Sequence, residues 1–201
     1  KTLSAILICC FISTIQMYGE NIQRPESENY VKGVEALNEG NPEAAYTYLN
    51  AEINEHPDNG YAHCYMALIC NFCNDTKLAL QALNSSLELI PEADTEYRSF
   101  AHYSRGVLLT NLKMWERAEA DLNEAIRLNP EDVENYKSRA QLYFETERYE
   151  ESLNDLTRAL KLDSKADVND LVLQLMAVAP TSEFMERITA TYQQLDQVTI
   201  H

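Results

Sequence analysis

The sequence predicts an all-α chain built from paired helices, and three observations lead to this prediction. The chain has only 5 Gly and 6 Pro among its 201 residues, too few for the turns of a sandwich of short β-strands. Its apolar residues recur at steps of three and four, the spacing of one helix face. Small residues return at a constant interval of 34 along the middle of the chain. A hydrophobic fraction of 45% also argues against a disordered chain.

The interval of 34 residues is carried by several pairs of positions. In the first half it joins Gly33 to Ala67, Ala45 to Ala79, Leu49 to Leu83 and Pro57 to Pro91. In the second half it joins Gly106 to Ala140, Ala118 to Ser152, Leu122 to Leu156 and Ala125 to Ala159. From Ala67 to Gly106 the interval is 39, so we place five inserted residues within 92–96, where they would lengthen the next helix at its start. The recurrence indicates four repeats, at residues 26–59, 60–91, 92–132 and 133–166.

Each repeat reads as two helices joined by a short turn. In the first repeat Asn41 can cap the second helix, and Pro42 fits the first turn of that helix because a missing N–H costs nothing there. In the third repeat the two helices are expected at 99–112 and 115–128. Small residues sit where paired helices approach each other, and prolines separate the repeats. The positions assigned to this framework are Gly33, Ala45, Pro57, Ala67, Ala79, Pro91, Gly106, Ala118, Ala125, Pro130, Ala140, Ser152 and Ala159.

The pattern resembles the tetratricopeptide repeat, a helix–turn–helix of 34 residues with small side chains at fixed positions, and the likeness covers about residues 26–166. The third and fourth repeats match best, with Trp115 in the turn and small residues Ala125 and Ala159 in the second helix. The first repeat departs by placing Glu52 at that small-residue position, and the fourth ends without Pro. The resemblance implies a right-handed α-solenoid in which the first helix of each repeat lines a concave side.

Residues 167–201 are predicted to form a C-terminal helical pair after the fourth repeat. Residues 164–167 have the spacing of a capping box for the first of these helices, and residues 181–183 can cap the second. The apolar stripe of the second helix consists of Phe184, Ile188, Thr191, Leu195 and Val198. A stacked array needs a terminal element to close its core, so we expect a capping role for the pair. The alternative is a docking face for a second copy or for a further domain.

The first 19 residues follow a different pattern, that of a secretory signal peptide. Lys1 precedes an apolar run over residues 3–15, and cleavage is expected near Gly19, which leaves 20–25 as a linker. A run of about 13 apolar residues is shorter than the roughly 20 that span a bilayer as a helix. We therefore expect an exported protein, periplasmic, envelope-associated or secreted, with no membrane span after processing. An uncleaved anchor and a buried terminal helix are the alternatives.

The charge balance bears on the class of partner. The chain carries 32 acidic and 16 basic residues, a net charge of −16, and contains no run of three basic residues. No nucleic acid partner is expected, because phosphate backbones are bound by clustered Lys and Arg. The acidic exterior favours basic partners.

The resemblance implies that the concave side binds a protein or peptide partner, whose identity the sequence does not give. At the positions that the family turns inward, the chain has aromatic side chains and recurring Asn amides, which can hold an extended peptide. The groove residues assigned in this way are Tyr30, Asn38, Tyr61, Asn71, Phe72, Phe100, Tyr103, Asn111, Lys137 and Phe144. For any single aromatic, packing between neighbouring helices is the alternative. Clamping of a terminal carboxylate, a known use of the family, is not expected because the corresponding positions hold no cation.

No catalytic site, metal site or cofactor is predicted. The four histidines are scattered, and the sequence has neither a Gly-rich phosphate loop nor a nucleophile elbow, so His63 and His102 read as surface or groove residues. Cys70 and Cys73 have CxxC spacing, but no strand precedes them, and Cys70 takes a core position. We expect packing there; a disulfide between the two that leaves Cys64 free is the alternative.

The function predicted from these features is that of a non-enzymatic protein–protein interaction scaffold. Three alternatives stay open. The chain could be the accessory part of a larger enzyme whose catalytic domain lies outside it. It could be a self-assembling structural subunit that uses the stripe over 184–198. It could also be a redox protein that acts through Cys70 and Cys73.

Overall fold

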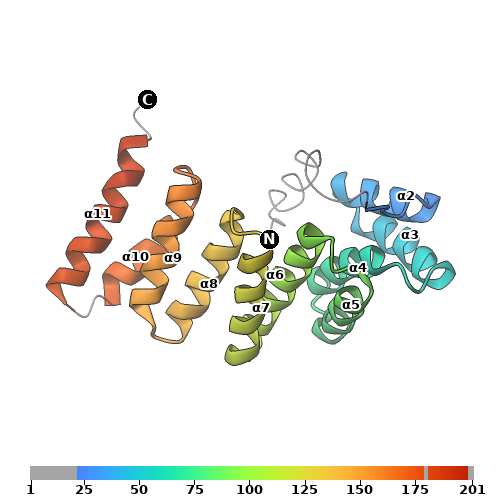
Figure 1. Cartoon of the computed structure of the whole chain (residues 1–201), viewed down its shortest axis with the longest axis horizontal. Helices are drawn as coiled ribbons and strands as arrows, with labels where there is room; N and C mark the ends of the chain where they lie inside the picture. Colours follow the sequence, from blue (N-terminus) through green and yellow to red (C-terminus); the bar gives the residue numbers. More distant parts are fainter. Residues whose placement is uncertain (1–21, 179–180, 199–201) are drawn as a thin grey trace. The chain divides into compact units, whose positions relative to one another are not determined.

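The computed structural model describes residues 22–178 and 181–198, so the predicted signal peptide lies outside the described residues. Within them the chain contains ten α-helices, α2 to α11, and no strand (Figure 1). The all-α prediction is confirmed. The chain divides into two compact parts, which we call the first lobe (residues 1–108) and the second lobe (residues 109–201) and describe separately.

The first lobe begins with two helical pairs. Helix α2 (Glu28–Asn38) packs on α3 (Pro42–Glu55), α3 packs on α4 (Gly60–Phe72), and α4 packs on α5 (Thr76–Leu89). Helix α6 (Thr95–Asn111) follows, and its last turn belongs to the second lobe. The facing sides of these helices bury a single apolar core. Each element therefore contributes one stripe to the interior, as the helical spacing predicts.

The second lobe continues the pairing. Helix α7 (Trp115–Leu128) packs on α8 (Val133–Glu145), and α8 packs on α9 (Tyr149–Leu162). Helix α10 (Asn169–Val178) contacts both α9 and α11 (Ser182–Val198). Phe184 and Ile188 of α11 are 2% and 0% exposed and join the core formed by α8, α9 and α10. The side chains of Leu195 and Val198, which complete the predicted stripe, lie outside the described ones.

Small side chains allow the paired helices to approach closely. The alanines assigned to the repeat framework are at most 1% exposed: Ala45, Ala67, Ala79, Ala118, Ala125, Ala140 and Ala159. At Gly33 an added Cβ would lie 2.7 Å from Cγ of Leu49, far inside normal contact. Ser152 replaces an alanine without loss, because its buried Oγ donates a hydrogen bond of 2.8 Å to the carbonyl of Ala140.

The turn between paired helices has the same backbone form in all four repeats. A residue in the left-handed region ends the first helix, and these residues are Gly40 (φ 72°), Asn74 (φ 61°), Lys113 (φ 58°) and Glu147 (φ 60°). The next amide in each turn donates to a carbonyl of the last helical turn, at distances between 2.8 and 2.9 Å. Gly and Asn adopt this conformation readily, whereas Lys113 and Glu147 do so against the steric preference of their Cβ atoms.

The helix starts agree with the sequence at most places and differ at one. Asn41 accepts a hydrogen bond from the amide of Ala44, and Thr181 accepts one from the amide of Phe184, as expected for caps. The insertion lengthens α6 to 17 residues, against 11 for α2. The predicted capping box at residues 164–167 is wrong. Asp163 instead accepts the amide of Lys165 in a local turn, which holds the chain out of a helix until Asn169.

Glu52 is buried at a small-residue position of α3. It is 1% exposed, and the amide nitrogen of Asn59 donates a hydrogen bond of 2.8 Å to its Oε1. Its Oε2 is buried with no hydrogen-bond partner among the described residues. The departure of the first repeat from the pattern therefore places a carboxyl group in the core, supported on one side only.

Candidate functional site

A pocket of about 120 Å³ lies among α4, α5 and α6 of the first lobe. It brings together three of the predicted groove residues, Asn71 at the end of α4 and Phe100 and Tyr103 on α6. The rings of Phe100 and Tyr103 are stacked, with centroids 6.4 Å apart and planes 24° apart. The remaining walls are mostly aliphatic and are made by Ala67, Leu68, Leu83, Val107 and Leu108, with Ser104 beside them.

Polar groups line one part of this apolar pocket. Asn71 is exposed, so its amide can both donate and accept at the rim. The Oγ of Ser104 is buried and has no hydrogen-bond partner among the described residues. The pocket thus combines stacked rings and aliphatic walls with two polar groups that can meet a backbone.

Four tyrosines form a buried cluster near the first turns of α4 and α6. Tyr61 meets Tyr97 edge to face at 4.8 Å, and the hydroxyls of Tyr65 and Tyr97 lie 3.0 Å apart. Tyr30 packs on Tyr65 with ring centroids 6.1 Å apart. Burial raises the pKa of Tyr30, Tyr61 and Tyr65 well above the ordinary value, so these hydroxyls stay protonated. Tyr30 and Tyr61 are 7% and 5% exposed, so packing is the main role of these two predicted groove residues.

An arginine from the segment before α2 enters the same cluster. Arg24 Nε donates to Oδ2 of Asp94 at 3.1 Å, and its Nη2 donates to Oδ1 of Asp94 at 3.2 Å and to Glu96 at 2.8 Å. The guanidinium carbon lies 4.5 Å from the centre of the Tyr97 ring. Burial lowers the pKa of Arg24, but the hydrogen bonds with Asp94 and Glu96 outweigh it and raise the pKa above its ordinary value. The guanidinium is therefore held as a charged group between two carboxylates and a ring.

Sequence reasoning missed the charged residues of this cluster, Arg24, Asp94 and Glu96. Arg24 falls in the predicted linker 20–25, and Asp94 and Glu96 fall in the five residues inserted before the third repeat. The sequence offered two hints of an ion pair here: a single cation in the predicted linker, and the carboxylates of Asp94 and Glu96 within the five inserted residues. Only folding brings them together across 70 residues of sequence.

The other predicted groove residues are not among those that line this pocket. Asn38 and Asn111 are exposed, and Phe72 is 44% exposed at the end of α4. In the second lobe, Phe144 is half-buried and packs on Tyr149 with ring centroids 5.7 Å apart. Lys137 pairs with Glu134 on its own helix and lines a separate pocket of about 180 Å³ with residues of α10.

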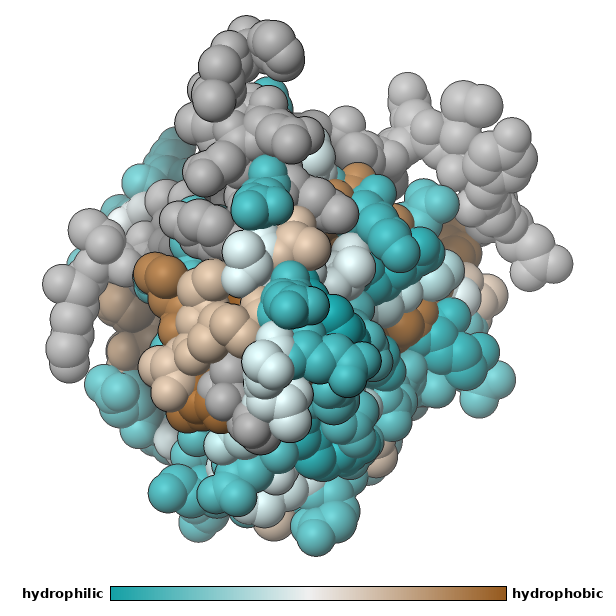
Figure 2. All heavy atoms as spheres, turned by 90° about the vertical axis from the view of Figure 1, so that its left-hand side faces the viewer, coloured by the Kyte–Doolittle hydropathy of each residue, from teal (hydrophilic) through white to brown (hydrophobic). Residues whose placement is uncertain are grey.

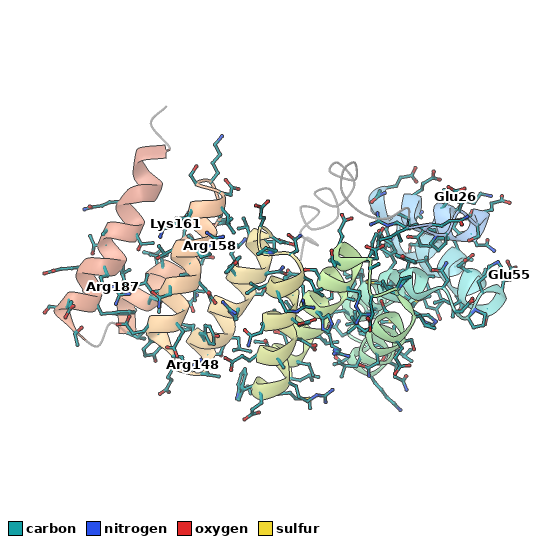
Figure 3. All side chains as sticks on the ribbon, in the orientation of Figure 1. Glu26, Glu55, Arg148, Arg158, Lys161 and Arg187 are labelled. Carbon is teal, nitrogen blue, oxygen red and sulfur yellow. The ribbon has the colours of Figure 1, made fainter. Side chains whose placement is uncertain are left out.

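Cations of the second lobe are largely engaged by its carboxylates and rings. Figure 3 labels four of them. Arg148 is the N-cap residue of α9, Arg158 and Lys161 lie on α9, and Arg187 lies on α11. Arg148 bonds both Glu119 and Glu151, and these hydrogen bonds raise its pKa. Arg187 bonds Glu150 on α9.

The surface of the C-terminal pair carries some apolar area. Figure 2 looks onto the side where α10 and α11 lie in Figure 1 and shows apolar atoms among hydrophilic ones. The exposed large apolar side chains of α10 are Leu173 and Val178, at 52% and 39%. Phe184 and Ile188 of the predicted stripe are buried within their own lobe, so they are not available for self-association.

The described residues also bear on metal and thiol chemistry. They contain no group of three or more His, Cys, Asp or Glu placed to hold a metal ion. Cys64, Cys70 and Cys73 are free thiols, so the alternative of a Cys70–Cys73 disulfide is not what the structure contains. Burial raises the pKa of Cys64 to about 12, which keeps this thiol protonated near neutral pH. Among the same residues no helix is both long and apolar enough to cross a bilayer.

Two family models match the chain, and both describe the tetratricopeptide repeat. One matches residues 99–132 and the other residues 134–165, the third and fourth repeats, which also follow the pattern best in the sequence. These matches identify residues 99–132 and 134–165 as tetratricopeptide repeats, in a chain whose ten described helices pack in pairs as such repeats do.

Relatives and solved structures extend this finding. The chain is 24% identical to human tetratricopeptide repeat protein 6 over 143 aligned residues, and the aligned region covers 71% of this chain and 26% of that protein. It is 30% identical over 87 residues to the lipoprotein NlpI homolog of Haemophilus influenzae, which covers 43% of this chain and 28% of that one. The matched region thus spans only about a quarter of the length of each curated relative.

The similar solved structures share the fold at low identity. MamA from Desulfovibrio magneticus RS-1 superposes with a TM-score of 0.68 at 19% identity, covering 85% of this chain and 94% of that one. YrrB, described as a tetratricopeptide repeat protein with an unusual peptide-binding site, superposes with a TM-score of 0.61 at 20% identity and covers 73% of each chain. These likenesses support the fold and leave the partner of this chain to be argued from its own residues.

Proposed function

We propose that this chain is a non-enzymatic scaffold that binds an extended segment of a partner protein in the pocket of α4, α5 and α6. Tetratricopeptide repeat proteins generally serve as protein–protein interaction scaffolds, and the solved structure of YrrB is described by its peptide-binding site. The observation that carries the proposal is the pocket itself, where Asn71, Phe100 and Tyr103 gather on neighbouring helices.

The size and chemistry of the pocket suit a peptide side chain. Its volume of about 120 Å³ is below the roughly 300 to 1,000 Å³ of sites that enclose a small molecule. Stacked aromatic rings offer a large contact area at a low entropic cost, and they often dominate interface energies. The amide of Asn71 at the rim can pair with the N–H and C=O of a peptide backbone. We therefore expect one apolar anchor to enter the pocket while the backbone runs along its rim.

A selection experiment tests this proposal with defined peptides. Random twelve-residue peptides displayed on phage would be selected on the immobilised full chain, and the best peptide would be measured by fluorescence anisotropy. The double variant Phe100→Ala/Tyr103→Ala should bind this peptide at least tenfold more weakly, because the stacked wall is removed. Tyr46→Ala is the matched control, since Tyr46 is 48% exposed on α3, away from the pocket. Equal binding by the folded double variant would refute the proposal.

We also propose export of the chain, on the strength of Lys1 and the apolar run over residues 3–15. One curated relative is named a lipoprotein, which agrees with an envelope location. A fusion of the full chain to alkaline phosphatase, an enzyme active only after export, should give activity in bacterial cells. The fusion should lose activity when residues 1–19 are deleted. Equal activity of both fusions, or none in either, would contradict export.

A further inference from the structure

The environment of Arg24 points to a binding site beyond the pocket. We propose that Asp94, Glu96 and Tyr97 form a receptor for an arginine side chain of the partner segment, and that Arg24 occupies this receptor as an intramolecular competitor. The inference rests on the proposed function, because the partner segment is the one that also enters the pocket of α4, α5 and α6.

The receptor is held in place by contacts that do not involve Arg24. Oδ1 of Asp94 accepts the backbone N–H of Tyr97 at 3.2 Å, which caps α6, and Oδ2 accepts the hydroxyl of Tyr61 at 3.0 Å. The Tyr97 ring is fixed edge-on by Tyr61 and by a hydroxyl contact with Tyr65. Asp94 is 1% exposed. The carboxylate and the ring are thus preorganised for a planar cation before one arrives.

Arg24 is held in the receptor by hydrogen bonds of its side chain. Arg24 lies in the non-helical segment before α2. Within residues 22–26 of the described chain, only Arg24 forms a hydrogen bond. Its side chain keeps 24% of its surface exposed. Withdrawing Arg24 therefore requires no helix to unfold, because Glu28 begins α2 independently. A ligand held by the hydrogen bonds of one side chain on a non-helical segment can exchange with a competitor.

The geometry selects arginine over lysine. Nε and Nη2 of Arg24 each donate to one oxygen of Asp94, and Nη2 also donates to Glu96. The guanidinium carbon lies over the Tyr97 ring. A planar fork can make all of these contacts at once, whereas an ammonium group is a point charge that cannot. Residues 22–108 contain 13 acidic and five basic side chains, so the lobe around the receptor also attracts cationic segments.

The receptor and the pocket lie next to each other along α6. Tyr97, Phe100 and Tyr103 follow one another at steps of three, so the receptor and the middle of the pocket are six residues apart along the helix. At a rise of about 1.5 Å per residue this is about 9 Å. A peptide extended in the polyproline II conformation advances about 3.1 Å per residue with three residues per turn, so side chains three residues apart lie on one side and span about 9 Å. The expected ligand is an extended peptide with an arginine and an apolar side chain about three residues apart.

The experiment uses the full chain and synthetic probes. The probes are fluorescein-labelled Ala-Arg-Ala-Ala-Leu-Ala, the same peptide in reverse order, and versions with citrulline, which lacks the charge, or lysine in place of arginine. Arg24→Ala should bind the tighter of the two arginine probes at least tenfold more strongly than the wild-type chain, because the competitor is gone. Arg24→Gln is a second variant that empties the receptor, and we call Arg24→Ala and Arg24→Gln the opening variants. Lys32→Ala is the control, because it removes a cation that pairs with Glu28 on α2.

Three further comparisons complete the test. Citrulline and lysine probes should each bind Arg24→Ala at least fivefold more weakly than the arginine probe. Adding Glu96→Gln to Arg24→Ala should weaken the arginine probe at least threefold, because one charged acceptor is lost. Adding Phe100→Ala/Tyr103→Ala should weaken it as well, since its leucine loses the pocket.

Several results would overturn the inference. One is that the arginine probe binds the wild-type chain and both folded opening variants with equal affinity. Another is that the arginine and citrulline probes bind Arg24→Ala with equal affinity. A phage-selected peptide that needs Phe100 and Tyr103 but is indifferent to Arg24 and Glu96 would overturn the receptor while leaving the proposed function intact. Failure of the proposed function would appear differently, as indifference of the selected peptide to Phe100 and Tyr103.

Discussion

Gly33→Ala tests the physical basis of the repeat, the need for small residues between paired helices. The added Cβ would lie 2.7 Å from Cγ and 2.8 Å from Cδ2 of Leu49, where carbon atoms normally keep about 3.5 to 4.0 Å. Leu49 is 0% exposed, so it cannot move aside into solvent. Overpacking of this kind costs about 1 to 3 kcal/mol, and the helix propensity of alanine returns about 1 kcal/mol. We expect a net loss of about 1 kcal/mol.

The sign of this effect should reverse when the clash is removed. In a Leu49→Ala background the space around residue 33 is open, so Gly33→Ala should stabilise the chain by about 1 kcal/mol through helix propensity alone. Urea denaturation followed by circular dichroism measures all four members of this double-mutant cycle. For a chain of this size, 1 kcal/mol corresponds to about 2 to 4 °C in Tm. Destabilisation of equal size in both backgrounds would refute the steric reasoning.

Three other predictions follow from particular residues. Glu147→Gly should raise the free energy of unfolding by about 0.5 to 1 kcal/mol, because Glu147 has φ 60° and glycine adopts this conformation without a Cβ clash. An unchanged or lower urea midpoint would contradict this prediction. Glu52→Gln should raise the thermal midpoint, because it replaces a buried carboxyl group by a neutral amide and still offers Asn59 an oxygen that accepts its hydrogen bond. A lower midpoint would show that burial of the Glu52 carboxyl group does not destabilise the chain. Iodoacetamide at pH 8 should label exposed Cys73 in the native chain and buried Cys64 only after unfolding, as located by peptide mapping. Labelling of Cys64 in the native chain would disprove its burial.

The sequence predicted the helical framework well because that framework depends on local signals. The 34-residue interval of Gly33, Ala45 and their counterparts marked buried contact positions, and the insertion before the third repeat lengthened α6 at its start. The start of α10 was wrong by a few residues, since the competing turn at Asp163 uses the same residue types as a helix cap.

The candidate site was less predictable, because it depends on which side chains meet across distant segments. Periodicity places Phe100 and Tyr103 on one face of a helix, but it does not show that they join Asn71 around one pocket. It also does not tell a groove aromatic from a packed one, so Tyr30 and Tyr61 were assigned to the groove although the structure buries them. Burial depends on the neighbours that the fold supplies, and those are set by long-range packing.

By itself, then, the sequence determined the paired helices, their small-residue contacts and the resemblance to the tetratricopeptide repeat, since each depends on spacing along the chain. Tertiary structure alone decided that Arg24 would reach Asp94, Glu96 and Tyr97, and that Glu52 would lie buried in the core. The physical reason is that spacing fixes the direction in which a side chain points from its own helix, whereas charge pairing and burial depend on what another segment brings within about 3 Å of it.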